Sequence, residues 1–306
     1  MSRYPDRDPE CTEATHPGPV ELTIRPRDHD LGGFSVRRVL PAPRRRMVGP
    51  FIFFDHMGPA EFPPGEGIQV RPHPHIGLAT VTYLFEGEIM HRDSLGFVQP
   101  IRAGAVNLMT AGSGIVHSER AGDDVATTSR LHGIQSWMAL PDGLEECDPG
   151  FIHYAAKDLP EFSVGAATVR LIMGEAWGQR SPVHQHSPTL YLECRIPAGA
   201  ELDLEPAGEL AVYVVAGAVT TAPGGQDSDT LDSGTLGVAR AGTGLSLKAD
   251  ADAHVMVIGG SPVGERHIWW NYVSGSRERI EKAKSDWRDG RFDKVPGDDE
   301  FIPLPD

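Results

Sequence analysis

Two stretches of the sequence decide the fold: Ala79-Thr80-Val81-Thr82-Tyr83-Leu84-Phe85-Glu86-Gly87 and Ala211-Val212-Tyr213-Val214-Val215-Ala216-Gly217. Both stretches are rich in β-branched and aromatic residues and end at a glycine, which is typical of a strand followed by a turn. Thr189–Arg195 has the same character. The 306 residues include 35 glycines and 26 prolines, so many short strands separated by turns are expected. The sequence therefore predicts an all-β protein of sandwiches or barrels.

The two stretches belong to an internal repeat. A shift of 130 residues without gaps aligns Tyr83 with Tyr213, Gly87 with Gly217, Gly104 with Gly234, Ala111-Gly112 with Ala241-Gly242, and Gly114 with Gly244. Matching glycines mark positions where the backbone needs a positive φ or a close approach. We expect two copies of one β-domain, joined near residues 141–165, with the first over 19–145 and the second over 146–262.

The two ends of the chain differ from this pattern. Residues 1–18 are rich in Pro, Asp, Glu, Thr and Arg and are expected to form a disordered tail. The C-terminal segment 263–306 is expected to contain an amphipathic helix over 274–290, with Gly290 as its C′ residue. Its apolar stripe is Ile280, Ala283 and Trp287, and Glu278 and Lys282 are spaced for an i, i+4 ion pair.

Composition excludes several classes of protein. The 28 Lys and Arg against 43 Asp and Glu give a net charge of −15, which argues against a direct nucleic-acid ligand. The run Arg44-Arg45-Arg46 has proline-rich flanks and is expected to be a solvated loop. Three separated cysteines form neither a disulfide framework nor a metal motif. With no membrane-spanning stretch and no signal-peptide core, we expect a soluble cytoplasmic protein, and a monomer is favoured.

Two short motifs carry candidate metal ligands. Flanking prolines hold Arg71–Gly77 extended, so His73 and His75 project from one face of the chain. His117 and Glu119 have the same two-residue spacing after Ile115-Val116. If the two strands converge inside a barrel, three imidazoles and one carboxylate meet there. A single His-x-His motif is weak evidence for a metal, because such histidines are more often surface or hydrogen-bonded residues.

The repeat supplies an internal control. At the 130-residue offset, Asp203 and Glu205 replace His73 and His75, while Leu247 and Ala249 replace His117 and Glu119. The glycines recur in the second copy but the four donors do not. This favours one scaffold shared by both copies, with a metal site in the first copy only. A metal-free protein with structural histidines is the alternative to this interpretation.

Other histidines are assigned secondary roles. His91, Asp93 and His56 are candidates to orient the ligating imidazoles, although a purely structural hydrogen-bonded role is favoured for each. His184 and His186 lie at the wrong place in the repeat and lack a His-x-Glu partner, so a solvated loop is expected there.

At these motifs the sequence resembles the pirin family of the cupin superfamily. The resemblance runs from about Gly33 to Phe292 and rests on HPHIGLATVTYLFEGEIMHRDSLG (73–96), IRAG (101–104), MTAGSGIVHSE (109–119) and WWNYVSGSRERIEKAKSDWRDGRF (269–292). It implies a bicupin, two tandem cupin β-barrels, with a single iron in the N-terminal barrel. It also implies that the residues matching the family's metal ligands are His73, His75, His117 and Glu119.

The chain departs from the general cupin pattern at one position. The pattern has a glutamate four residues after the second histidine, where this chain has Ala79. The fourth ligand is then Glu119, or three imidazoles hold the metal alone. Such donors suit Fe(II), and also Mn, Co, Ni, Cu or Zn. In a six-coordinate ion, four protein ligands leave two positions open for exchange.

The resemblance implies two classes of function. Some pirins are quercetin 2,3-dioxygenases, which open a flavonol with O₂, and Glu119 would then be both a ligand and the catalytic base. Animal pirins act as iron-dependent transcriptional cofactors, so the alternative is an iron-binding, redox-responsive interaction protein with a protein partner and no turnover.

Overall fold

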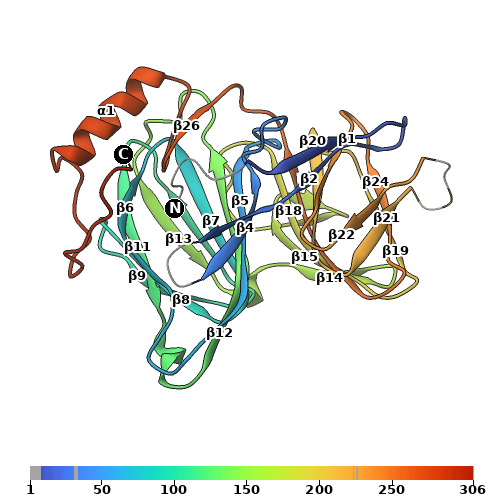
Figure 1. Cartoon of the computed structure of the whole chain (residues 1–306), viewed down its shortest axis with the longest axis horizontal. Coiled ribbons are helices and arrows are strands. Elements are labelled where there is room, and N and C mark those ends of the chain that lie inside the picture. The colour runs from blue at the N-terminus through green and yellow to red at the C-terminus, as the bar shows by residue number, and fades with distance from the viewer. Residues whose placement is uncertain (1–7, 31–33, 223, 225–226, 306) are drawn as a thin grey trace.

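The computed structural model describes residues 8–30, 34–222, 224 and 227–305. Figure 1 shows two β-barrels side by side, with the helix α1 on the outer side of the first. Each barrel is made of one large and one four-stranded antiparallel sheet. The expected all-β architecture with one C-terminal helix is therefore confirmed.

The first barrel contains a seven-stranded sheet in the order β13-β10-β7-β12-β5-β4-β3 and a four-stranded sheet in the order β6-β11-β8-β9. The large sheet consists of β3 (Arg27–Asp30), β4 (Ser35–Leu40), β5 (Phe51–Phe62), β7 (Leu78–Glu86), β10 (Val106–Thr110), β12 (Ser129–Ala139) and β13 (Gly150–Tyr154). The small sheet consists of β6 (Gln69–His75), β8 (Glu88–Asp93), β9 (Val98–Arg102) and β11 (Ile115–Ala121).

The second barrel repeats this plan with sheets β1-β2-β23-β20-β25-β18-β15-β14 and β19-β24-β21-β22. The large sheet consists of β1 (Glu10–Glu13), β2 (Val20–Arg25), β14 (Glu161–Val164), β15 (Ala167–Met173), β18 (Thr189–Ile196), β20 (Glu209–Ala216), β23 (Leu236–Ala239) and β25 (Ala253–Gly260). The small sheet consists of β19 (Glu201–Leu204), β21 (Ala218–Thr221), β22 (Thr230–Asp232) and β24 (Leu245–Lys248). The hairpin β16 (Glu175–Ala176) and β17 (Gln179–Arg180) and two 3₁₀ turns, Asp123–Ala126 and Ala156–Asp158, complete these parts of the chain.

The glycines of the repeat occupy equivalent turns. Gly87 and Gly217 have φ of 91° and 77°, and Gly104 and Gly234 have φ of 76° and 85°. These are left-handed conformations, in which a residue with a Cβ is strained. The matching glycines of the repeat are therefore explained by the backbone conformation, because both copies make the same tight turns.

The strand pairing crosses the predicted domain limits. Residues 10–13 were expected in a disordered tail, but they form β1, which pairs with β2 in the large sheet of the second barrel (Figure 1). Arg240 fixes residues 16–18 by donating hydrogen bonds to the carbonyls of His16 and Gly18. Conversely, β13 pairs with β10 of the first barrel. The tail prediction is thus wrong for this part, because distant strands supply the hydrogen bonds that a local composition argument omits; residues 1–7 lie outside the described residues.

A shared core joins the two barrels. Its largest apolar cluster contains Phe51 and Phe54 of the first barrel together with Tyr191 and Met256 of the second. The repeat-related tyrosines Tyr83 and Tyr213 both reach across this interface. The Tyr213 hydroxyl lies 2.8 Å from Nδ1 of His56, and the Tyr83 hydroxyl donates a hydrogen bond to Glu193.

The C-terminal segment returns to the first barrel. A short hairpin, β26 (His267–Trp269) and β27 (Tyr272–Ser274), precedes α1 (Arg277–Arg288). The helix starts three residues later than expected because Ser274 is still strand; the Ser276 side chain caps it by accepting a hydrogen bond from the Arg279 amide. Gly290, with φ of 68°, follows the C-cap as expected.

The side chains of α1 confirm one expectation and correct another. Ile280 and Ala283 are buried against Tyr272 and Trp270, with Trp287 packed beside them. The expected Glu278–Lys282 pair is not formed: Lys282 pairs with Asp286 at 2.6 Å, and Glu278 instead accepts a hydrogen bond from the Ser276 hydroxyl.

Within the described ranges, no helix is both long and apolar enough to cross a membrane.

Glu193 makes the interface sensitive to pH. Burial alone would raise its pKa, but hydrogen bonds from His254 and Tyr83 outweigh burial and lower the pKa to about 2 from 4.5. A carboxyl group with a depressed pKa contributes stability above its unfolded pKa and loses that contribution as the pH falls through the folded value. We expect Glu193→Gln to lower the free energy of unfolding by on the order of 3 kcal/mol at pH 7, with a deficit that shrinks between pH 4.5 and 2. Urea unfolding across this range measures it, with the exposed Glu201→Gln as control; a constant deficit would contradict it.

Gly77 places the C-terminal segment against β6. Its φ is 65°, and a Cβ there would lie 2.0 Å from the carbonyl oxygen of Val273 in β27. Gly165 has a similar φ of 58° but open space around it. We therefore expect Gly77→Ala to cost about 1–3 kcal/mol more in unfolding free energy than Gly165→Ala. Equal losses, measured by urea unfolding, would show that only the backbone angle matters.

Candidate metal centre

Strands β6 and β11 deliver the histidines of the two motifs. They pair antiparallel with His73 directly opposite His117, and the two-residue spacing places His75 on the same inner face. The prolines Pro72 and Pro74 are tolerated because β6 is the edge strand of its four-stranded sheet.

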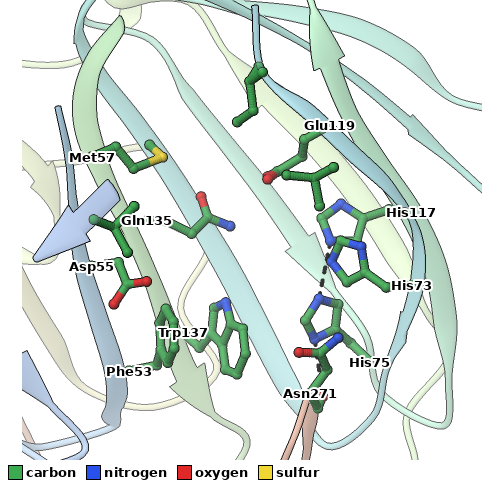
Figure 2. Close-up of a pocket in the computed structure, with 13 residues that line it drawn as sticks. Phe53, Asp55, Met57, His73, His75, His117, Glu119, Gln135, Trp137 and Asn271 are labelled. Carbon is green, nitrogen blue, oxygen red and sulfur yellow. Dashed lines mark hydrogen bonds between the residues drawn. The ribbon is translucent and has the colours of Figure 1, made fainter. Parts of the chain in front are cut away.

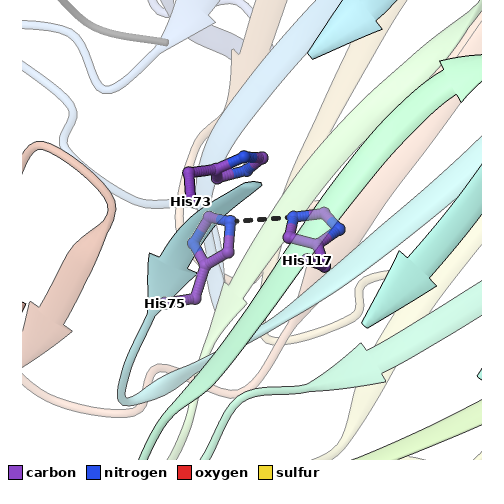
Figure 3. Close-up of side chains that lie close together, drawn as sticks. All are labelled: His73, His75 and His117. Carbon is purple, nitrogen blue, oxygen red and sulfur yellow. Dashed lines mark hydrogen bonds between the residues drawn. The ribbon is translucent and has the colours of Figure 1, made fainter. Parts of the chain in front are cut away.

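The three imidazoles converge inside the first barrel, as Figure 3 shows. One nitrogen of each ring, from His73, His75 and His117, lies within 4.8 Å of the others. The Nε2 atoms of His75 and His117 are 3.1 Å apart. All three side chains are buried, with at most 5% exposed. The structure thus brings together three of the four predicted ligands.

Two of the rings are oriented by backbone carbonyls. Nδ1 of His73 lies 2.9 Å from the carbonyl of Arg71, and Nδ1 of His75 lies 3.1 Å from the carbonyl of Asn271. A carbonyl oxygen can only accept, so each Nδ1 carries the proton. Each Nε2 is then left with its lone pair, which is the form that binds a metal.

The third ring is oriented by a relay of side chains. Nδ1 of His117 lies 3.4 Å from Nδ1 of His91, whose Nε2 lies 2.9 Å from the Asp93 carboxylate. The other Asp93 oxygen accepts from the amides of Leu95 and Phe97. Asp93 thus accepts a hydrogen bond from the Nε2–H of His91, which leaves Nδ1 of His91 to accept one from the Nδ1–H of His117. His91 therefore contacts His117 of the triad directly, and Asp93 contacts His91; both were candidates to orient the imidazoles, with a structural role favoured for each.

Burial keeps the triad neutral. It lowers the pKa of His73 to about 4 and holds the pKa of His75 and His117 well below 6.5, with the neighbouring histidines lowering both further. Neutral imidazoles with free Nε2 lone pairs are the donor set that a divalent transition metal needs. The residues present therefore fit such an ion.

Glu119 lies in the same cavity as the triad but outside the group of three close donors. It follows His117 by two residues on β11 and is 9% exposed. Burial raises its pKa to about 7 from 4.5. The charged form of a buried carboxyl group without a counter-charge is stabilised by a nearby cation; without one, the group tends to bind a proton.

The wall opposite the triad comes from β5 and β12 (Figure 2). Phe53 and Trp137 stack there with ring centroids 3.9 Å apart. Asp55 is held by two hydrogen bonds from the buried Arg38, at 2.7 and 2.8 Å, so its charge is already compensated. The cavity between the two walls has a volume of about 50 Å³, room for a few waters.

Two amides line this cavity with unsatisfied groups. Oε1 of Gln135 and both side-chain polar atoms of Asn271 are buried without a hydrogen-bond partner in the described part of the chain. Buried polar atoms normally have partners, so these atoms fit a polar guest. Sequence reasoning missed both. The available signals were the amide of Gln135 between Ile134 and the buried end of strand β12, and Asn271 within the aromatic Trp269–Tyr272 stretch.

The second barrel shows what replaces the triad. His117 pairs with His73, whereas its equivalent Leu247 pairs with Leu202, one residue before the position given by the 130-residue offset. The residues equivalent to His73 and His75 are thus Leu202 and Leu204 rather than Asp203 and Glu205. The three leucines lie in the second barrel's apolar core. The ungapped comparison was wrong by one residue here, although its conclusion that the second site lacks these donors still holds.

The remaining predicted histidines lie elsewhere. His56 does not contact the triad: its Nδ1 faces Tyr213, and its Nε2 lies 2.8 Å from Nε2 of His132 at the interface between the barrels. His184 is exposed, and His186 lies 2.9 Å from the Thr110 hydroxyl. Neither belongs to a group of three close donors in the described residues.

Two family models match the chain in tandem. The one described as Pirin matches residues 33–138, and the one described as Pirin C-terminal cupin domain matches residues 191–293. The chain belongs to the pirin family. The resemblance stated from the motifs is confirmed, and with it the tandem cupin fold.

Two curated relatives and one solved structure are similar to most of the chain. A pirin-like protein of Caulobacter vibrioides is 48% identical over 94% of this chain and 100% of its own length. A Pseudomonas aeruginosa protein, provisionally named as a quercetin 2,3-dioxygenase, is 41% identical over 86% of this chain and 82% of its own. The crystal structure of a quercetin 2,3-dioxygenase from Acinetobacter baumannii matches with a TM-score of 0.83 and 32% identity, covering 93% of this chain and 94% of that one.

Metal content tests the triad directly. We expect wild-type protein, purified anaerobically with Fe(II), to hold about one metal ion per chain. His75→Ala removes a donor whose partners stay in place, so we expect the metal to be lost, while His186→Ala retains it as a matched control. Elemental analysis measures all three; equal metal in His75→Ala and wild type would exclude this pocket as the binding site.

Proposed function

We propose that this pirin is a metal-dependent dioxygenase that opens the central ring of flavonols such as quercetin with O₂. The observation that carries the proposal is the set of three buried, neutral histidines with Nδ1 hydrogen-bonded outward and Nε2 directed inward. The relatives named for quercetin 2,3-dioxygenase activity support the choice of reaction.

In this proposal His73, His75, His117 and Glu119 hold one ion. Iron(II) is our choice, and the same donors suit Mn, Co, Ni, Cu or Zn. When bound, the ion supplies Lewis acidity toward the substrate oxygen and the redox capacity that reaction with O₂ requires.

Glu119 is the proposed base. Its side chain lines the cavity and makes no hydrogen bond or ion pair to the described residues, so its carboxylate can accept the proton of the flavonol 3-hydroxyl. Gln135 Oε1 is available to accept a hydrogen bond from a second substrate hydroxyl, and Asn271 Nδ2 to donate one to the ring carbonyl. These three groups would orient the substrate relative to the triad.

The apolar residues of the cavity have two roles. Val36, Ile68 and Val70 keep bulk water from the reacting groups, and the Phe53–Trp137 stack offers a flat face to an aromatic ring. Sites for molecules of flavonol size usually have about 300 Å³ or more. The cavity is smaller, so substrate entry requires side chains that line it to move, and Met57 is a flexible one among them.

The overall reaction balances without another reactant. Both oxygen atoms of O₂ enter the product, two carbon–carbon bonds of the central ring break, and the carbon between them leaves as carbon monoxide. The organic product is an aryl ester that carries a free carboxylic acid.

Oxygen uptake with quercetin tests the proposal. We expect iron-loaded wild-type protein to consume one O₂ and release one CO per quercetin. Glu119→Gln keeps the volume but removes the base, so we expect turnover to fall at least 100-fold. Glu88→Gln, a buried glutamate of the neighbouring strand outside the cavity, serves as the matched control and should retain activity.

Full iron occupancy without oxygen uptake would contradict the dioxygenase proposal. It would favour the alternative, an iron-binding interaction protein, whose binding to a protein partner should then differ between Fe(II) and Fe(III). Equal loss of activity in both glutamate variants would show that the effect is not specific to the cavity.

A further inference from the structure

A second cavity lies on the outer side of Phe53. It has a volume of about 130 Å³, and its lining includes Arg27, Arg38, Arg46, Phe53 and Trp270. Phe53 is the one residue that it shares with the lining of the metal cavity. Three arginines line it, of which Arg38 is already paired with Asp55, and its lining also includes Asp8, which is exposed.

The inner wall of this cavity is built rigidly. Arg38 is 2% exposed, is fixed to Asp55 by two hydrogen bonds, and stacks its guanidinium 4.3 Å from the centre of the Phe53 ring. The other face of Phe53 stacks on Trp137. An aromatic ring that enters the cavity therefore meets a preorganised aromatic and cationic wall.

Arg46 provides a cation that has no partner among the described residues. In the run Arg44-Arg45-Arg46, expected to be a solvated loop, Arg44 pairs with Glu13, and Arg45 pairs with Glu21 and Glu209. Arg46 lines the cavity and makes no hydrogen bond or ion pair to any described residue. Two arginines of the run thus pair with glutamates of the second barrel, and the third is available to a ligand.

We propose that this cavity is a binding site for a small aromatic carboxylate. The ring would lie among Phe53, Ile268 and Trp270, and the carboxylate would accept hydrogen bonds from Arg46. Arginine is suited to this because its planar guanidinium matches a carboxylate with two parallel hydrogen bonds. The site lies outside the triad, so it does not require the proposed dioxygenase reaction.

Benzoate is the probe, titrated calorimetrically into the full-length chain. We expect saturable binding of benzoate, at least ten-fold weaker binding of the neutral benzamide, and weaker benzoate binding at high salt. Arg46→Gln should lower benzoate affinity at least ten-fold. Arg44→Gln is the matched control from the same run and should leave affinity unchanged, and melting temperatures verify that both variants fold.

Two further arms identify the source of any signal. Benzoate affinity should persist in His75→Ala, because the ligand lies outside the metal cavity; its loss there would place benzoate on the triad and overturn the proposal. Inorganic phosphate should bind at least ten-fold more weakly than benzoate, since it cannot use the aromatic wall. Equal affinity for benzoate and benzamide, an unchanged Arg46→Gln, or no benzoate binding would each overturn it.

Discussion

The candidate metal centre depends on where three imidazole protons are held. A neutral histidine has one ring proton, so an acceptor at Nδ1 decides that the lone pair is at Nε2. For His75 that acceptor is the carbonyl of Asn271, 196 residues further along the chain. The close approach of Val273 to Gly77 positions this carbonyl, because only a glycine leaves room for it. The C-terminal segment is therefore part of the site in the N-terminal barrel.

The two barrels show opposite uses of one scaffold. Where the first barrel places histidines, the second places Leu202, Leu204 and Leu247, which fill its core. Burying imidazoles forgoes that apolar packing and costs desolvation, which the outward hydrogen bonds offset only in part. The continuous core between the barrels, to which Phe54 and Tyr213 contribute a ring contact, lets the second barrel support the first. A polar centre thus occurs in one copy, while three leucines keep the corresponding position of the other copy apolar.

Local signals in the sequence predicted the strands, the repeat, the turn glycines and the convergence of His73, His75 and His117. Long-range pairing was not accessible. Residues 10–13 have no local reason to be a strand and become one only beside β2. The one-residue slip between β6 and β19 is invisible to an ungapped comparison, since a register shift beside His117 changes which residues face each other. Gln135 and Asn271 were missed because their role depends on orientation within a cavity.

Phe53 connects the chemistry of the two cavities. Its ring contacts Trp137 on the metal side and Arg38 on the outer side, and Arg38 in turn holds Asp55 at the wall of the metal cavity. The inner cavity offers lone pairs to a cation, whereas the outer one offers cations to an anion. The stack and the Arg38–Asp55 pair meet at this one ring, so a wall of the outer cavity and a wall of the inner one share a single rigid support.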